Sequence, residues 1–445
     1  MMQEVRPSDN RLAVSETIAV LRAAAEKHLL FYGRDFSDVI IARAAGAYMY
    51  DLDGRAILDF SSGQMCSTIG HNHPAIASAL RRSAEEVIHL DSTKLSPSVI
   101  ALAQELCAQL PRQLQRVMFL NTGSESNEAA IRLAKLHTGR FEISALGGSW
   151  HGMTAGSQSS TYASGRHGYG PALPGTFSLP APNAFRCPIR HCADRCDSTC
   201  LEVGFELFDG WSVGAGAAVI AEPVQSANGI IVPPEGYLRR LKELCSARGM
   251  LLIFDEAQTG LGRVGSNFAF ETEDVVPDIL TLSKTLGAGV PLAATVTSDV
   301  INADARAKRF SFYTSHVSDP MPAEVGLAVL RLIVSEKLAV RANEIGKYLF
   351  DGLLELKQRY EVIGDVRGRG LLIGVELVED RRFRKPAHTL MQLATDRCLQ
   401  LGLNINKAGG PNAVWRIAPP LTIEKSDIDS ALSILDTALG QCGAR

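Results

Sequence analysis

The sequence predicts an α/β fold with a mainly parallel sheet, and three observations support this prediction. Short apolar segments typical of buried strands alternate with helical segments through the middle of the chain. In one of these, EGYLRRLKELCSARG, apolar residues recur at helical spacing and Gly249 provides a stop signal. The 445 residues are 46% hydrophobic and 21% charged, as expected for a globular protein with a large core.

Six segments have the apolar character of buried strands. They are VMFLN (117–121), FEISAL (141–146), AAVIAE (217–222), MLLIFDE (250–256), DILTLSK (278–284) and AATVTS (293–298). Ligands of parallel sheets bind beyond the C-terminal ends of the strands. Polar residues at those ends are therefore the first candidates for a functional site.

The pattern changes after about residue 325. A long helical pattern leads into the glycine-punctuated strand GDVRGRGLLIGVELV, and a further helix, a loop near NKAGGPN and a last strand–helix pair follow. We therefore expect a large domain over residues 71–325 and a small α+β domain over 326–445. Residues 1–70, with the hairpin-like segment AYMYDLDGRAILDF, are expected to pack against the small domain.

Composition limits the classes of partner and compartment. A net charge of −3 gives no sign of nucleic acid or an anionic membrane surface as partner. The N-terminal segment lacks the apolar core of a secretory signal, and no apolar run is long enough to span a bilayer. With mostly dispersed cysteines, this predicts a cytoplasmic protein with reduced thiols.

One cysteine-rich segment, CPIRHCADRCDSTC, contains possible zinc ligands. These are Cys187, His191, Cys192, Cys196 and Cys200. The segment has no CxxC pair and is typical of a surface excursion, so we assign it no function.

Lys284 and Asp255 are the first candidates for chemistry. Lys284 lies at the end of an apolar, strand-like segment, and Asp255 lies at the end of another. Charged side chains are rarely buried without a partner, so their position needs an explanation. A pyridine cofactor bound as an imine needs a lysine amine and a carboxylate that keeps the ring nitrogen protonated. The alternative is that Asp255 caps a helix and Lys284 is solvated.

Two further features favour the cofactor interpretation. Gly123 and Ser124 lie in a turn between a strand and a helix, where free N–H groups and the helix dipole suit a phosphate, although such residues also cap helices generally. Trp150, in the glycine-rich turn GGSWHGMT, could stack on a flat ring or pack in the core.

From about residue 25 to the C-terminus, the chain resembles fold-type I, pyridoxal-phosphate (PLP)-dependent enzymes of the class III aminotransferase family. The motif MLLIFDEAQTGLGRVG, followed by PDILTLSKTLGAGVPLAA, is very specific to that family. The segments ILDFSSGQMCSTIGHNHP, SWHGMT, FYTSHVSDP and WRIAPPLT most resemble its 2,2-dialkylglycine decarboxylase group. That group converts a dialkylated amino acid to a ketone and CO2 and transfers the amino group to pyruvate, giving L-alanine. The resemblance implies a mainly parallel, seven-stranded sheet in the large domain.

The resemblance also implies roles around the cofactor. Lys284 matches the Schiff-base lysine, which also shuttles a proton, and Asp255 matches the partner of the pyridine nitrogen. Gln258 matches the donor to the phenolic oxygen of the ring, and Trp150 matches the residue stacked on the ring face.

The phosphate contacts and the assembly follow from the same resemblance. Gly123 and Ser124 match the turn that cradles the phosphate, and Ser315 matches a hydroxyl residue that reaches it from the neighbouring subunit. We therefore expect a homodimer or a dimer of dimers, with amino acids and 2-oxo acids as substrates.

Three residues match substrate contacts. Arg416 matches the arginine that binds the substrate carboxylate through a bidentate pair, the alternative being an exposed arginine at a strand end. Gln64 matches a glutamine that holds the scissile carboxylate, and Met153 matches a residue that lines the small alkyl pocket. A carboxylate held perpendicular to the cofactor ring favours loss of CO2, whereas a hydrogen in that position lets Lys284 remove a proton for transamination. Gln64 therefore favours decarboxylation, and Lys284, Gln64 and Trp150 are the expected catalytic residues.

The decarboxylase resemblance further implies an alkali-metal site for K+ or Na+ near the dimer interface. Its ligands would be oxygens, as a hard cation requires. The matching residues are Leu90, Ser92, Ser315, Val317 and Asp319.

Two departures leave the amino substrate open. Ala227 stands where the decarboxylase group has a serine, and the loop over residues 406–413 also differs. Both border the pocket that selects the substrate. The alternatives are a class III aminotransferase or PLP-dependent lyase acting on another amine without decarboxylation, and a PLP-sensing regulator. The regulator would need a DNA-binding module, and no basic helix-turn-helix segment precedes residue 25.

Overall fold

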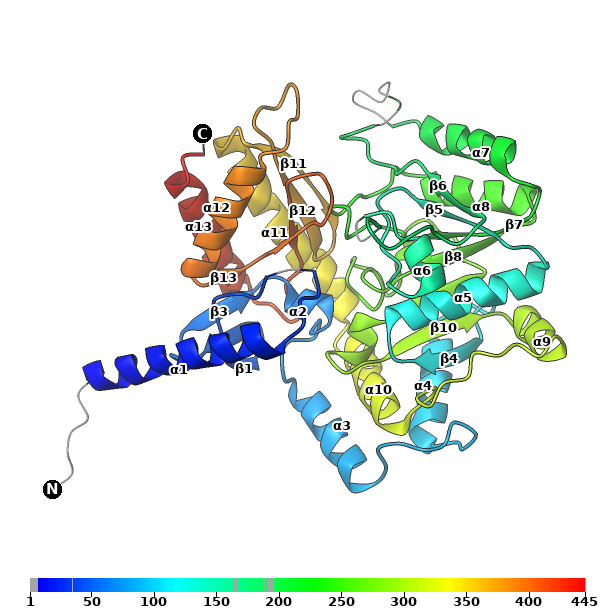
Figure 1. Cartoon of the computed structure of the whole chain (residues 1–445), viewed down its shortest axis with the longest axis horizontal. Helices are drawn as coiled ribbons and strands as arrows, with labels where there is room; N and C mark the ends of the chain where they lie inside the picture. Colours follow the sequence, from blue (N-terminus) through cyan, green and yellow to red (C-terminus); the bar gives the residue numbers. More distant parts are fainter. Residues whose placement is uncertain (1–6, 34, 164–165, 188, 190–195, 445) are drawn as a thin grey trace.

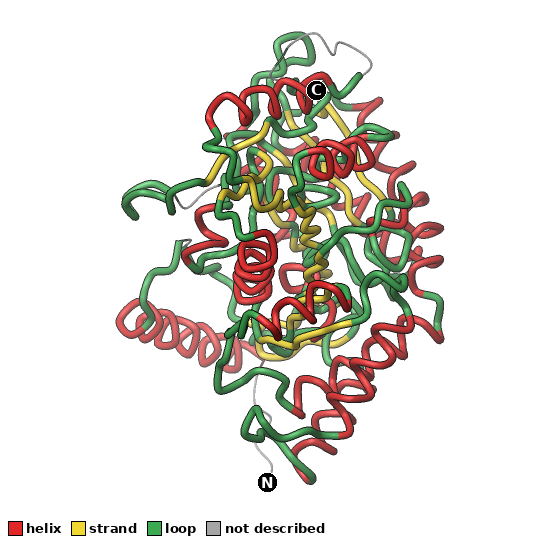
Figure 2. The backbone as a smooth tube through the Cα atoms, turned by 90° about the vertical axis from the view of Figure 1, so that its right-hand side faces the viewer, coloured by secondary structure: helices red, strands yellow, loops and turns green. Residues whose placement is uncertain are grey.

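The structure is a computed structural model that describes residues 7–33, 35–163, 166–187, 189 and 196–444. A large sheet with its helices forms one part of the molecule, and the C-terminal helices lie beside it together with the N-terminal strands (Figure 1). Figure 2 shows the strands in the interior with helices around them. The predicted α/β class is therefore confirmed.

The large sheet has seven strands in the order β4-β10-β9-β8-β7-β5-β6. They are β4 (Arg116–Leu120), β5 (Glu142–Leu146), β6 (Thr176–Leu179), β7 (Gly216–Ala221), β8 (Leu251–Asp255), β9 (Ile279–Leu282) and β10 (Ala293–Thr297). β10 runs antiparallel to both of its neighbours, and the pairs from β9 to β6 are parallel. All six predicted strands are present. Sequence analysis did not locate β6, whose four residues are mostly only partly buried at the sheet edge.

Helices cover this sheet, as its buried strands require. Every residue of β5, β7, β9 and β10 is buried, which is the pattern of a sheet covered on both faces. The helices of this part are α3 (Pro74–Glu85), α4 (Pro97–Ala108), α5 (Gly123–Thr138), α6 (Ala155–Ser159), α7 (Thr199–Trp211), α8 (Tyr237–Ala247), α9 (Asp299–Ala307) and α10 (Pro320–Ser335), with short 3-10 helices at Ala269–Thr272 and Lys284–Gly287.

The C-terminal part contains a second, antiparallel sheet in the order β11-β12-β15-β14. Its elements are β11 (Ile363–Arg369), β12 (Leu372–Leu377), β14 (Asn406–Lys407), β15 (Val414–Ile417), α11 (Leu338–Arg359), α12 (His388–Gln400) and α13 (Lys425–Gln441).

Two predictions for this part need correction. The long helical pattern forms two helices, α10 and α11, because Lys337 between them is left-handed with φ 51°. The glycine-punctuated strand is a hairpin, β11–β12, which turns at Gly370. At this residue φ is 55° and a Cβ would lie 2.5 Å from the carbonyl carbon of Val264, so the turn needs glycine.

The N-terminal segment pairs with the C-terminal part. It comprises α1 (Pro7–His28), β1 (Ile41–Ala45), β2 (Tyr48–Asp51), β3 (Ala56–Asp59) and α2 (Ser62–Met65). β2 and β3 form the predicted hairpin, and β3 pairs in parallel with β13 (Leu403–Asn404). This pairing joins the two ends of the chain, while the domain boundaries at residues 70 and 325 stay predictions. Within the described residues, no helix is long and apolar enough to cross a bilayer.

Candidate active site

A cavity of about 360 Å³ lies at the C-terminal ends of the large sheet's strands and contains Lys284. Gly123, after β4, and Trp150, after β5, also line this cavity. Lys284 begins the short 3-10 turn after β9 and has a left-handed φ of 45°. The structure therefore brings together the lysine, the phosphate-turn residue and the tryptophan that sequence analysis selected.

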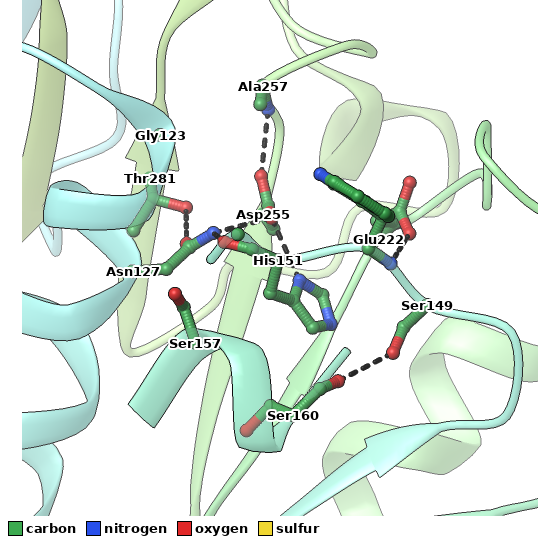
Figure 3. Close-up of polar contacts among 12 residues, drawn as sticks. Gly123, Asn127, Ser149, His151, Ser157, Ser160, Glu222, Asp255, Ala257 and Thr281 are labelled. Atoms are coloured by element: carbon green, nitrogen blue, oxygen red, sulfur yellow. Dashed lines mark hydrogen bonds and ion pairs between the residues drawn. The ribbon is translucent and has the colours of Figure 1, made fainter. Parts of the chain in front are cut away.

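Asp255 ends β8 next to this cavity and is the centre of a buried hydrogen-bond network (Figure 3). Asn127 donates from Nδ2 to Oδ2 of Asp255 at 2.7 Å, and Nδ1 of His151 lies 2.8 Å from the same oxygen. The backbone N–H of Ala257 donates to Oδ1 at 3.1 Å. Thr281 in turn holds Asn127 through a 2.7 Å hydrogen bond to its Oδ1. The carboxylate is thus fixed from three directions.

The environment of Asp255 keeps it ionised. Burial alone would raise the pKa of this carboxyl, but the hydrogen bond and charge of His151, the Ala257 N–H and the charge of Lys284 outweigh it, so the pKa is lowered. Nδ1 of His151 faces this carboxylate, and Nε2 of the fully buried ring has no hydrogen-bond partner among the described residues. A fixed anion at this position suits the protonated nitrogen of a pyridine.

The turn at the start of α5 has the features of an anion site. Thr122 and Glu125 form a capping box, which orders the first turn of the helix. The first N–H groups of a helix have no partner within it and carry the positive end of its dipole. Ser124 Oγ accepts a hydrogen bond from the N–H of Met153 at 2.9 Å, and a Cβ on Gly152 would come within 2.2 Å of that Oγ. The turns after β4 and β5 therefore close against each other.

Glu222 connects the turn of Trp150 with the turn that bears Ala227. It accepts hydrogen bonds from the N–H of Trp150 at 2.9 Å and from the N–H of Ser226 at 3.0 Å. Burial raises the pKa of this fully buried carboxyl. Sequence analysis did not select Glu222, although a charged residue directly after a buried strand was an available signal.

Gln64 lies in a second, larger cavity of about 960 Å³, which is also lined by Asn406 and Lys407. Cys66, two residues further on, lines the cavity of Lys284. The turn that carries Gln64 therefore stands between the two cavities. Arg416 lies in β15 opposite Asn406 of β14, so two of the three expected substrate residues, Gln64 and Arg416, belong to this side of the site.

The two departures noted in the sequence are in contact. The N–H of Gly409, within the loop 406–413, donates to the carbonyl of Ala227 at 3.4 Å. Asn228 packs so closely on Gly148 that a Cβ there would lie 2.1 Å from its Nδ2. Ala227 and the loop 406–413 thus form one wall beside the pocket expected to select the substrate.

The roles of three other candidates stay predictions. Gln258 is partly buried in the turn that follows β8, and Ser315 is exposed. The role of Ser315 requires a neighbouring subunit. The side chain of Met153 is 52% exposed, although its backbone contacts Ser124.

Among the expected alkali-metal ligands, Asp319 has two histidine partners. His89 Nδ1 lies 2.6 Å from its Oδ1, and His316 Nδ1 lies 2.5 Å from its Oδ2. Ser92 Oγ donates to the carbonyl of Thr314 at 3.4 Å, which brings the two ligand segments together. Both carboxylate oxygens thus already have imidazole partners, and an alkali ion would share them. The metal site stays a prediction.

In the cysteine-rich segment, His191 and Cys192 lie outside the described residues. Burial, with smaller contributions from Cys196 and Cys187, raises the pKa of the Cys200 thiol to about 11. A thiol of this kind is a poor nucleophile.

The cavity of Lys284 fits PLP on three observations. Asp255 is a fixed buried anion, the α5 N-terminus opens on the cavity, and Lys284 lies in it. Asp255 suits a pyridine nitrogen, the α5 N-terminus suits a phosphate, and the Lys284 amine suits an aldehyde.

Comparisons with known proteins agree with this site. The family model described as aminotransferase class III matches residues 32–439. An uncharacterised aminotransferase of Schizosaccharomyces pombe is 46% identical over 418 residues, which cover 93% of each chain. A leucine/methionine racemase of Thermococcus litoralis is 35% identical over 412 residues, which cover 91% of each chain.

Solved structures show the same fold. An amine transaminase from an uncultivated Pseudomonas species, determined in its PLP-bound form, superposes with a TM-score of 0.86 at 31% identity over 93% of this chain and 99% of that one. A Bacillus anthracis aminotransferase gives a TM-score of 0.90 at 27% identity over 96% and 99% of the two chains. The chain therefore belongs to the PLP-dependent class III aminotransferase family.

Proposed function

We propose that this enzyme is a decarboxylation-dependent aminotransferase. Its reaction converts a 2,2-dialkylglycine to a ketone and CO2 and transfers the amino group to pyruvate, giving L-alanine. The observation that carries the proposal is the position of Gln64, whose turn stands between the cavity of Lys284 and the cavity bordered by the strand opposite Arg416.

The residues of the chain divide the work as follows. When bound, PLP accepts the electron pair of the bond that breaks at the substrate Cα. Asp255 holds a proton at the pyridine nitrogen, and Trp150 restrains the ring face. The amine of Lys284 would hold the cofactor between turnovers and would move the Cα proton of L-alanine in the half-reaction with pyruvate.

Two carboxylate contacts decide which bond breaks. A dialkylglycine has one carboxylate and no hydrogen on Cα, so decarboxylation requires Gln64 to hold that carboxylate perpendicular to the ring. In the second half-reaction, Arg416 binds the carboxylate of pyruvate or alanine through a bidentate pair, and Lys284 transfers the proton at Cα.

A second candidate function is amino transfer from another amine without decarboxylation, by an aminotransferase or lyase of the same family. It is favoured by the contact between Ala227 and Gly409, because the two departures from the decarboxylase pattern meet there and border the pocket expected to select the substrate. The relatives include a racemase from Thermococcus litoralis and a probable 4-aminobutyrate aminotransferase from Bacillus subtilis, so related scaffolds carry several activities.

A product assay separates the two functions. Purified holoenzyme is given 2-aminoisobutyrate and pyruvate, and CO2, acetone and L-alanine are measured. The proposal predicts all three in equal amounts. Absence of all three, together with turnover of a monoalkyl amine, would establish the second function instead.

We also propose that the enzyme is a homodimer, or a dimer of dimers, with an alkali ion held near the interface. The dimer is supported by the exposure of Ser315, which the resemblance assigns to the neighbouring subunit's phosphate. The ion is supported by the hydrogen bond from Ser92 to Thr314, which brings Ser92 close to the segment of Ser315 and Asp319. Activity measured in K+, Na+ and an organic cation of equal ionic strength tests the ion, and sedimentation velocity tests the assembly. Equal activity in all three media would remove the alkali ion from the proposal.

A further inference from the structure

We propose that Asp59 is a positioning residue for the reaction. Its buried carboxylate holds the turn that presents Gln64 and fixes this turn relative to the strand opposite Arg416. The inference rests on the proposed role of Gln64 and adds a residue that controls the partition between decarboxylation and amino transfer.

The turn that carries Gln64 has an unusual backbone. Four consecutive residues are left-handed, with φ of 46° at Ser62, 55° at Gly63, 58° at Gln64 and 65° at Met65. Only glycine adopts this conformation without strain, so three of the four residues need outside support. Strain of this kind persists only where surrounding contacts over-determine the backbone, and it concentrates at functional sites.

Asp59 supplies much of this support from directly before the turn. Its carboxylate is fully buried and accepts hydrogen bonds from the backbone N–H groups of Ser61, at 3.0 Å, and Gly63, at 2.8 Å. Ser61 Oγ donates to it at 2.8 Å, and His71 Nε2 lies 2.8 Å from it. Two of these donors are amides of the turn region itself, so the carboxylate acts directly on the backbone.

The fifth donor comes from the other end of the chain. Asn404 Nδ2 donates to Asp59 Oδ1 at 2.8 Å and to Ser61 Oγ at 3.1 Å. Asn404 ends β13, and two residues later Asn406 begins β14 opposite Arg416. Asp59 thereby connects the Gln64 turn with the segment that pairs with the arginine strand.

The shared carboxylate couples two groups that the proposed reaction uses in different half-reactions. If the turn relaxes, the side chain of Gln64 leaves the position perpendicular to the ring, and a displacement of about 1 Å costs roughly a hundredfold in rate. Amino transfer from L-alanine depends on Arg416 and Lys284 and loses less. An asparagine at position 59 has one acceptor oxygen and an NH2 group that faces donors, so Asp59→Asn breaks this arrangement at constant size.

The experiment compares Asp59→Asn with Asp51→Asn. Asp51 also closes a turn, accepting from the N–H of Arg55 at 2.8 Å, but in the β2–β3 hairpin, where its hydrogen bonds join Asp53 and Arg55 and not the Gln64 turn. For each variant, the rate of CO2 release from 2-aminoisobutyrate is divided by the rate of amino transfer from L-alanine. Hydrogen exchange of the amides of residues 61–65 is followed separately by mass spectrometry, on the protein without substrate.

We expect Asp59→Asn to lower this ratio by roughly tenfold to a hundredfold and to speed exchange in residues 61–65, while Asp51→Asn changes neither. Asn404→Ala, which keeps the carboxylate, should lower the ratio by a smaller factor, and it carries the test if Asp59→Asn does not fold. An unchanged ratio in Asn404→Ala and in folded Asp59→Asn overturns the inference, even if exchange speeds up.

Failure of the proposed function gives a different result. If the wild-type enzyme releases no CO2, that function is wrong. In that case, unchanged exchange in Asp59→Asn also overturns the structural part of the inference, whereas faster exchange supports it.

Discussion

The two ends of the candidate site are built in different ways. At the cofactor end, Gly123, Trp150, Asp255 and Lys284 each follow or end a strand of one sheet. Asn127 of α5 and His151 of the turn after β5 fix Asp255. At the substrate end, the chain brings together segments far apart in sequence. The cofactor end thus follows from the sheet itself, whereas the substrate end depends on tertiary contacts.

This difference shows where the family can vary. A change in a strand-end residue such as Asp255 removes the anion that the cofactor needs, so the cofactor end has little freedom. The contact between Gly409 and Ala227 joins two loops, and loops tolerate substitution. Common cofactor chemistry can therefore serve different substrates, and five predictions test this division.

The largest effect is expected at the cofactor end. Lys284→Ala should lower turnover at least about a hundredfold, because general acid–base catalysis by one group contributes 10²–10⁴-fold. Borohydride reduction followed by peptide mass spectrometry should find the cofactor on Lys284 in the wild type and on no residue in the variant. Lys308→Ala, which alters a surface lysine paired with Asp304, is the control. A cofactor adduct on a different lysine in the wild type would contradict the assignment.

The next effect belongs to the substrate end. Arg416→Lys should reduce kcat/KM for amino transfer from L-alanine by roughly tenfold to a hundredfold, since a charge-assisted bidentate contact is worth about 1.5–3 kcal/mol. Isopropylamine, which lacks the carboxylate, is the matched substrate and should show no such loss. Equal losses for the two substrates would mean that Arg416 does not bind a carboxylate.

A pair of glycine variants sharpens the comparison of the loops. Gly148 has φ 78° and its missing Cβ would collide with Asn228, whereas Gly214 has φ 80° and no atom within 4 Å of that position. Both changes to alanine carry a backbone cost of about 1 kcal/mol. Only Gly148→Ala should also change KM for the amino substrate, by several-fold, because Asn228 adjoins Ala227. The same KM in both variants would show that this wall does not touch the substrate.

The smallest effect concerns stability in acid. Burial would raise the pKa of Asp59, but hydrogen bonds from His71, Asn404, Ser61 and Gly63 outweigh it and lower the pKa. Its contribution is therefore present above the usual carboxyl pKa near 4 and lost as the pH falls through the lower folded-state value.

Thermal unfolding measures this contribution. Asp59→Asn should melt a few degrees below the wild type at pH 7, for a loss of about 2 kcal/mol, and the gap should narrow below pH 4. Asp51→Asn provides the baseline. A gap that stays constant down to pH 3 would contradict the role of the ionised carboxylate.

The sequence predicted the fold to the extent that the fold is local. Apolar runs in the sequence indicate buried strands, and all six predicted strands are present. Three features were missed for identifiable reasons. β6 is short and lies at an edge, Lys337 breaks a helical pattern without a proline or glycine, and the hairpin turn at Gly370 is set by the approach of Val264.

The same limit applies to the site. Strand-end position and motif identified Asp255 and Lys284, but the polar residues that orient Asp255 carry no distinctive local signal. Asn127 lies within a helix and is separated from Asp255 by 128 positions. Asn404 and Asp59 are 345 positions apart, and only the pairing of β3 with β13 brings them together. Such contacts depend on the completed fold.

The central claim is that the substrate end, through Gln64, selects the bond that breaks. The most direct test measures the two half-reactions of Gln64→Ala separately, as CO2 release from 2-aminoisobutyrate and as amino transfer from L-alanine. The account predicts that CO2 release falls by at least about tenfold more than amino transfer, in line with loss of a positioning contact. Equal slowing of both half-reactions would contradict it.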